Sequence, residues 1–309
     1  MRPSLDHPGG LVEIVEPATP LPRIEIFGNG FSVLPDLLIA GTPRNDGLTL
    51  SFPDGTSRIV TVPGLFAIGR PWLSPDGKFA AVQATETRVE PGSGAPPLFT
   101  VYLVDLASGT FRRLGDVPRD PATQSELPVW FPSGDRIAYW TTRDGCLVVK
   151  VREVAGAKDA LTIARDGTSG CYQPQRGILD GVRFHTAVSA DSSKILVPGQ
   201  MQIYDAKTGA LLADVRQQAM AGIAAAGYKP DARFPGQAGG GTFPLDGAFS
   251  PDGKQIAFDG AVEKDGTFGV LVCVINVDGT GFRILRGPLS TTPKLSNDHN
   301  FSQVSPRWR

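Results

Sequence analysis

Several features that would assign this chain to a class are scarce or missing. With only three cysteines in 309 residues, it is not a disulfide-stapled scaffold. The sequence leaves two possibilities for these cysteines: a single bridge between Cys146 and Cys171, or three reduced thiols. No stretch of about 18 apolar residues occurs, so we expect no membrane span. The 30 basic and 31 acidic residues nearly cancel, which argues against nucleic acid as a partner, because that partner requires a basic surface.

Familiar catalytic motifs are missing as well. The sequence has no Gly-x-Ser-x-Gly nucleophile turn, no His-Glu-x-x-His zinc motif and no phosphate-binding Walker loop. We therefore predict no resident cofactor. The segment from Met1 to Pro8 lacks the apolar core of a signal peptide. We expect a periplasmic or secreted protein whose targeting peptide has been removed, with a cytoplasmic protein as the alternative.

Glycine and proline, in contrast, are abundant, at 37 and 27 residues. So many turn-forming residues predict many short strands and hence an all-β fold. The chain also repeats itself: four segments carry an apolar anchor before a turn, and a fifth, 305–309, has the anchor alone. The anchors stand 57 to 61 residues apart, at Leu73, Trp130, Val188, Phe249 and Trp308. The turn reads Ser-Pro-Asp-Gly at 74–77 and 250–253, where each residue type favours a tight turn.

Each full repeat is typical of four strands joined by short turns. The third strand of the last full repeat, 270–275, is apolar at every position, so it must be buried on both faces. Cys273 within it is then a small core residue rather than a reactive thiol. A four-stranded sheet that is covered on both faces by copies of itself is a blade of a β-propeller.

Ring closure decides the number of blades. Strands expected at 37–40, 48–52 and 58–62 lack an inner strand, whereas 304–309 is an inner strand without a blade. Pairing this C-terminal strand with the N-terminal strands would close the ring and remove two exposed edges. We therefore predict five blades in a single domain, 36–309, after an N-terminal extension, 1–35. Six blades are the alternative, with further strands in 11–34 or in 217–243, although the alanines of the latter favour a short helix or a loop.

The repeat resembles that of the TolB-like β-propeller family. The similarity lies in the Ser-Pro-Asp-Gly-Lys turn after an aromatic anchor, in the Ile-Ala-Phe strand at 256–258 and in the segment Val-Ile-Asn-Val-Asp-Gly-Thr-Gly at 274–281. It extends over about residues 36–309. The resemblance implies a periplasmic propeller that binds partners, and related propellers form domains of peptidases and polysaccharide lyases. The repeats here are longer than those of the family, and five blades are one fewer than its usual six.

Long connections predict where a site would lie. Those at 115–126, 165–184, 216–245 and 287–303 should all emerge on one face of the ring. The residue three before each anchor begins the inner strand on that face, and four of the five are polar: Arg70, Leu127, His185, Asp246 and Ser305. The ligand-binding candidates on this face are Arg70, Arg183, Asp246, Asp298, Tyr172 and Arg176.

Two functions fit this arrangement. The first is a monomeric binding propeller that takes a protein or a small polar ligand on its long-loop face. The alternative is a lyase, isomerase or hydrolase acting on a small polar or carbohydrate-like substrate, with His185 and His299 as general acid and base. Imidazoles within about 8 Å of each other would support that alternative. A divalent metal held by the two histidines and Asp246 is a weaker option.

Overall fold

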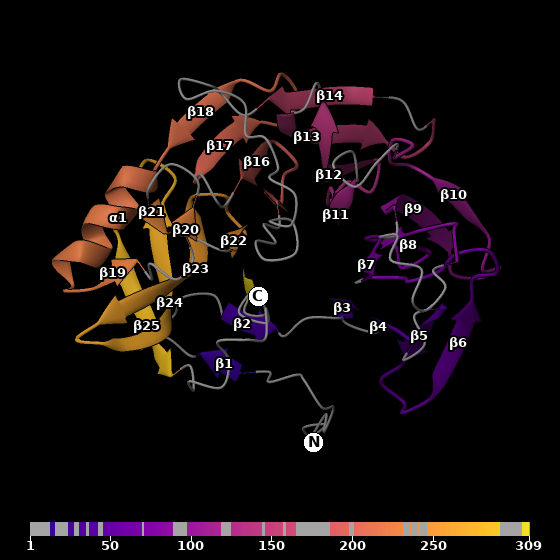
Figure 1. Ribbon diagram of the computed structural model, residues 1–309, viewed down its shortest axis with the longest axis horizontal. Helices are drawn as coiled ribbons and strands as arrows, with labels where there is room; N and C mark the ends of the chain where they lie inside the picture. The colour runs from indigo at the N-terminus through magenta and orange to yellow at the C-terminus, as the bar shows by residue number, and fades with distance from the viewer. Residues whose placement is uncertain are drawn as a thin grey trace. The chain divides into compact units, whose positions relative to one another are not determined.

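The computed structural model describes sixteen ranges of the chain (Figure 1). These are 13–15, 24–27, 31–34, 37–42, 46–69, 71–88, 98–118, 125–143, 146–156, 159–164, 186–197, 201–230, 235–236, 240–241, 246–290 and 305–308. The chain forms two compact units, Gly30–Leu179 and the combination of Met1–Asn29 with Asp180–Arg309. Within these ranges, no helix has the length and the apolar character to cross a membrane.

The described residues of the 30–179 unit form three antiparallel sheets of four strands, in which the strands follow chain order. The first strand of each sheet lies beside the first strand of the next, β3 beside β7 and β7 beside β11. The strands are β3 (Phe31–Leu34), β4 (Leu37–Gly41), β5 (Gly47–Ser51) and β6 (Ser57–Thr61), then β7 (Trp72–Leu73), β8 (Phe79–Ala84), β9 (Thr100–Asp105) and β10 (Phe111–Arg113), then β11 (Glu126–Trp130), β12 (Arg136–Arg143), β13 (Cys146–Glu153) and β14 (Asp159–Ala164).

In the second unit, the described residues form three further sheets of three or more strands, a two-stranded hairpin and one helix. One sheet joins the two ends of the chain, because β26 pairs with β2. The strands are β15 (Ala187–Val188), β16 (Lys194–Val197), β17 (Gln202–Asp205) and β18 (Leu211–Asp214), then β22 (Asp246–Phe249), β23 (Gln255–Lys264), β24 (Thr267–Asn276) and β25 (Arg283–Ser290) with β19 (Lys229–Pro230), then β1 (Glu13–Val15), β2 (Ile24–Phe27) and β26 (Ser305–Trp308), and the hairpin β20 (Pro235–Gly236) with β21 (Gly240–Gly241).

The turn between the first and second strands is built in the same way in three sheets. In the β22–β23 turn, the Ser250 hydroxyl donates to Asp252 Oδ1 at 2.6 Å and accepts from the Gln255 amide at 2.9 Å. Ser74 and Ser189 make the same pair of bonds in their own turns. The fourth residue needs a positive φ, which Gly253 adopts at +66°. The repeated Ser-x-Asp element is therefore a structural device, as the sequence predicts.

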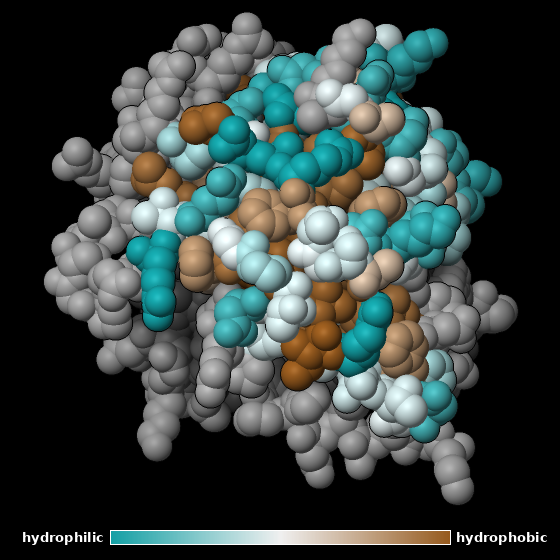
Figure 2. Space-filling view, turned by 90° about the vertical axis from the view of Figure 1, so that its right-hand side faces the viewer, coloured by the Kyte–Doolittle hydropathy of each residue, from teal (hydrophilic) through white to brown (hydrophobic). Residues whose placement is uncertain are grey.

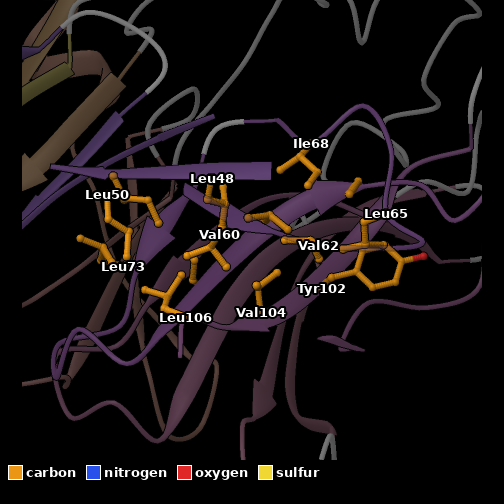
Figure 3. Packing of buried hydrophobic residues seen from close by; sticks show 14 residues of the cluster. Leu48, Leu50, Val60, Val62, Leu65, Ile68, Leu73, Tyr102, Val104 and Leu106 are labelled. Atoms are coloured by element: carbon orange, nitrogen blue, oxygen red, sulfur yellow. The ribbon is translucent and has the colours of Figure 1, made fainter. Parts of the chain in front are cut away.

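Apolar side chains fill the space between neighbouring sheets of the 30–179 unit. Leu48, Leu50 and Val60 of one sheet meet Leu73 and Val104 of the next in a single cluster (Figure 3). A second cluster joins that sheet to β11–β14, and there the indole nitrogen of Trp130 donates to the Trp72 carbonyl at 2.9 Å. On the side shown in Figure 2, apolar areas of the surface are interrupted by polar side chains.

The third strand of the β22–β25 sheet is buried along the whole of the predicted run. The side chains at 270–275 are at most 4% exposed, which confirms that both faces are covered. Leu271, Cys273 and Ile275 share a cluster with Ala219 and Ile223 of α1 (Arg216–Ala225). The helix lies where the alanines predicted one. It fits closely, because a Cβ on Gly222 would lie 2.2 Å from the Phe282 ring.

The N-terminal strands differ from the prediction. Strands β4–β6 do not lack a first strand, because β3 pairs with β4 from Leu34↔Leu37 to Phe31↔Ala40. The C-terminal strand pairs with β2 instead, with Trp308 opposite Ile24. The repeat did not reveal β3 because no Ser-x-Asp-Gly turn follows it: only two residues, Pro35 and Asp36, separate it from β4. Strands β1–β3 thus fall within residues 1–35, which the sequence analysis assigns to an extension.

Replacing Ser250 tests the turn. The variant Ser250→Ala removes the hydroxyl that receives the Gln255 amide in a buried turn, so the free energy of unfolding should fall by about 1–2 kcal/mol. Urea denaturation measures the change. Ser57→Ala, at an exposed position of β6, is the matched control and should change it by less than about 0.5 kcal/mol. Equal effects of the two variants would contradict a role for the hydroxyl.

The turn aspartates predict a dependence of stability on pH. Hydrogen bonds from Ser189 and Ser193 lower the pKa of Asp191, and the Ser74 hydroxyl lowers that of Asp76. Because these pKa values lie below the unfolded value of about 3.9, the stabilisation is complete above that pH and is lost as pH falls through the folded-state values.

The melting temperature should accordingly fall steeply below about pH 4. Asp191→Asn should lower it at pH 7 and flatten the acid limb. Glu153→Gln, which removes an exposed carboxylate from β13, should leave that limb unchanged. Calorimetry between pH 3 and pH 7 gives both quantities, and identical curves for wild type and Asp191→Asn would refute the assignment.

Candidate functional site

The structure describes little of the predicted site. Asp246 is the first residue of β22, and its backbone position is described. The other candidates lie outside the described residues: Arg70, Tyr172, Arg176, Arg183, His185, Asp298 and His299. The distance between the two imidazoles, on which the enzymatic hypothesis depends, and the disulfide between Cys146 and Cys171 therefore stay predictions.

Asp246 belongs to a row of residues that crosses its sheet. In the register of β22–β25, Asp246 pairs with Asp259, Asp259 pairs with Val272, and Val272 pairs with Arg286. Residues directly opposite one another in antiparallel strands share a face of the sheet. Three of the four positions in this row carry a charged residue. The row lies at the end of β22 that is remote from the Ser250 turn, where the 216–245 connection arrives.

Asp259 stands out for its burial. Its exposed fraction is 0%, and among the described residues it is the only acidic or basic side chain that is buried. Nearer the turn, the small apolar cluster of Ala257, Val274 and Leu285 occupies this sheet. Strand β26 lies beside β22 and β23. A carboxylate in such surroundings is costly to bury unless other groups compensate its charge.

The negative charge of Asp259 affects the pKa of its neighbour Cys273. Burial raises the pKa of the Cys273 thiol, and the negative charge of Asp259 raises it further. Cys273 is a buried cysteine outside any disulfide. Since the thiolate is the nucleophilic form of cysteine, this residue is a poor nucleophile, in agreement with its predicted role in the core.

The repeat shows what is unusual about Asp259. It is the sixth residue after the last residue of its turn, and the corresponding residues of the other repeats are Gln83, Trp140 and Pro198. The other repeats thus have uncharged residues at this position. Sequence analysis missed Asp259 because it followed the inner strands alone. An acidic residue directly after the buried strand Ile-Ala-Phe is the signal that would have found it.

The described residues contain no group of three histidine, cysteine, aspartate or glutamate side chains arranged to hold a metal ion. The metal site considered from the sequence requires His185 and His299, which lie outside these residues.

Comparison with solved structures defines the fold. TolB from Acinetobacter baumannii superposes with a TM-score of 0.51 at 16% identity, over 89% of this chain and 63% of that one. A protein assigned as TolB from Agrobacterium tumefaciens gives 0.51 at 17% identity, over 84% and 80%. Hydrazine synthase from Kuenenia stuttgartiensis gives 0.50 at 16% identity, over 85% and 66%.

With its antiparallel sheets and these neighbours, the chain is a β-propeller. Within that class its fold is the TolB-like one, which confirms the resemblance seen in the repeat. The chain spans less than two thirds of the length of the Acinetobacter TolB. No family model matches the sequence, and no match appears among curated proteins.

The surroundings of Cys273 predict its reactivity. In a Cys146→Ser/Cys171→Ser variant, Cys273 is the sole thiol. We expect no reaction with a disulfide reagent at pH 8 in the folded protein and one thiol per chain in 6 M urea, because the group is buried and its pKa is raised. Absorbance of the released thiolate reports the reaction, and rapid labelling of the folded variant would contradict the assignment.

Proposed function

We propose that this protein is a binding propeller whose long-loop face takes a partner that presents a basic side chain. The TolB-like fold supports a binding role, and Asp259 is the observation that carries the proposal. Burying a carboxylate is unfavourable, and the other repeats have uncharged residues at this position. A carboxylate at this position is therefore not a general requirement of the repeat, which favours a role in recognition.

Asp246 and Asp259 would have different roles. Asp259 has no exposed surface, so it acts as a supporting residue that adds negative potential from within the sheet. Asp246, its partner in the register and the first residue of the inner strand, would be the ligand contact. An ammonium or guanidinium group is the complement of such a carboxylate. Arg70, Arg183, Tyr172, Arg176 and Asp298 lie outside the described residues and stay candidates from the sequence alone.

Six blades belong to the same proposal. The described residues include six sheets of at least three strands, which supports the six-bladed alternative over five. The sixth blade would consist of β1, β2 and β26, so that the two ends of the chain contribute to one sheet. The proposal also includes a monomeric state, and the resemblance to TolB supports a location in the periplasm.

Binding of three labelled peptides of equal length tests the proposal. One is lysine-rich, one neutral and one glutamate-rich. We expect the lysine-rich peptide to bind wild type most tightly and Asp246→Asn at least about tenfold more weakly, because a charge-assisted contact is lost. Asp278→Asn is the control, since Asp278 serves only its own turn by accepting from Thr280. Fluorescence anisotropy measures the affinities.

Two results would count against the proposal. One is equal affinity for all three peptides, and the other is the same loss in Asp246→Asn and Asp278→Asn. The enzymatic alternative makes a separate prediction: turnover of a carbohydrate-like substrate that His185→Ala and His299→Ala both abolish and that Asp278→Asn leaves intact.

A further inference from the structure

Four charged residues form a closed network between two sheets of the 30–179 unit. We call Asp116, Lys150, Arg152 and Asp159 the ionic clamp. Lys150 Nζ lies 2.9 Å from Asp116 Oδ2 and 3.0 Å from Asp159 Oδ2. The Arg152 guanidinium lies 3.0 Å from Asp116 Oδ1, and its Nε donates to Asp159 Oδ1 at 2.8 Å. Each cation thus bridges both carboxylates.

The two cations are far less exposed than the two carboxylates. The side chains of Lys150 and Arg152 are 13% and 11% exposed, whereas those of Asp116 and Asp159 are 39% and 50% exposed. Tyr139, with a fully buried side chain, lies beneath them, and its ring centre is 5.9 Å from the Arg152 guanidinium carbon. Removing one carboxylate would therefore leave a surplus positive charge in a poorly solvated place.

The clamp joins two sheets that are separate in the hydrogen-bonding pattern. Asp116 follows β10, whereas Lys150 and Arg152 lie on β13 and Asp159 begins β14. The backbone around Asp116 is held as well, since its carbonyl accepts from the Thr100 hydroxyl at 2.8 Å. An arginine of each sheet also donates a hydrogen bond to a backbone carbonyl beside the other sheet: Arg152 to Leu114, and Arg112 to Val154.

We propose that the ionic clamp is an acid-sensitive tie that holds β13 and β14 to the β7–β10 sheet at neutral pH and releases them locally when Asp159 takes up a proton. Protonation neutralises an aspartate while Lys150 and Arg152 keep their charges. The remaining cations then repel each other without full compensation. Below the clamp, the contacts of Trp72, Leu103, Trp130 and Ile137 do not depend on pH, so the apolar part of the interface stays closed.

The direction of the pH dependence follows from the groups that face one another. Burial raises the pKa of Asp159, but hydrogen bonds from Lys150 and Arg152 outweigh it, so the net pKa is lowered. The stabilisation that Asp159 contributes is therefore complete above the unfolded aspartate pKa of about 3.9 and is lost as pH falls through its lower folded-state pKa. Tyr139 is neutral in this range, because the ordinary pKa of tyrosine is about 10 and burial raises it further.

Hydrogen exchange of the wild-type protein provides the first test. Protection factors, corrected for the intrinsic effect of pH, are measured at pH 7 and at pH 3.5 for the amides of β13 and β14, and for those of β5 as the reference within the same unit. We expect local opening of β13 and β14 to increase by about threefold at the lower pH, while β5 changes less. Equal changes in the two regions would overturn the proposal.

Charge-balanced variants provide the second test. At pH 7, Asp116→Asn should increase the opening of β13 and β14 by about tenfold, because it leaves the cations undercompensated. Asp116→Asn/Lys150→Met removes one charge of each sign, so it should open less than the single variant. Asp54→Asn is the matched control, because it removes one carboxylate from the exposed β5–β6 turn. It should leave the opening of β13 and β14 unchanged.

Additive or larger damage in the double variant would refute the clamp, as would wild-type protection in Asp116→Asn. Should Asp116→Asn fail to fold, Asp159→Asn replaces it, because that carboxylate contacts the same two cations from β14. The wild-type comparison of pH 7 with pH 3.5 is independent of either variant.

Discussion

The structure depends on covering both faces of each sheet with apolar side chains. A sheet of four short strands is marginal by itself, and fully burying one valine or leucine contributes only about 1.5–3 kcal/mol. The clusters around Leu48 and around Trp72 fill the two sheet-to-sheet boundaries of the 30–179 unit. In the second unit, the buried run at 270–275 shows the same requirement in a single strand. The sequence repeats regularly because every sheet must be covered by a neighbour of nearly the same kind.

Helix α1 shows how the constraint is met where the repeat becomes irregular. Strands β23 and β24 have ten residues each, whereas β16 and β17 in the preceding sheet have four. Such short strands cannot cover the whole of the longer ones. The helix supplies Ala219 and Ile223 to the uncovered part, and Asp214 accepts from the Arg216 amide at its start. The 216–245 connection is thus partly core.

The elements that sequence analysis identified are those with local causes. Ser250 and Asp252 form a turn within a few residues, and the run at 270–275 is apolar at every position, which predicts its burial. Strand β3 has neither signal, so it was missed. Asp259 was missed because its position matters only relative to the register with Asp246. The ionic clamp joins Asp116 to Arg152 across two sheets, and such a contact depends on how sheets face each other, which residue periodicity does not encode.

Two glycines differ in how closely other atoms approach them, and this difference decides where a label or a tag can be inserted. Beside Gly222, the Phe282 ring leaves no space for even one additional carbon. Around Gly266, at the tip of the β23–β24 hairpin, nothing approaches within 4 Å of such a carbon. A fluorescent reporter or an affinity tag inserted at the tip would extend into solvent, whereas the same insert in the helix would displace the hydrophobic core.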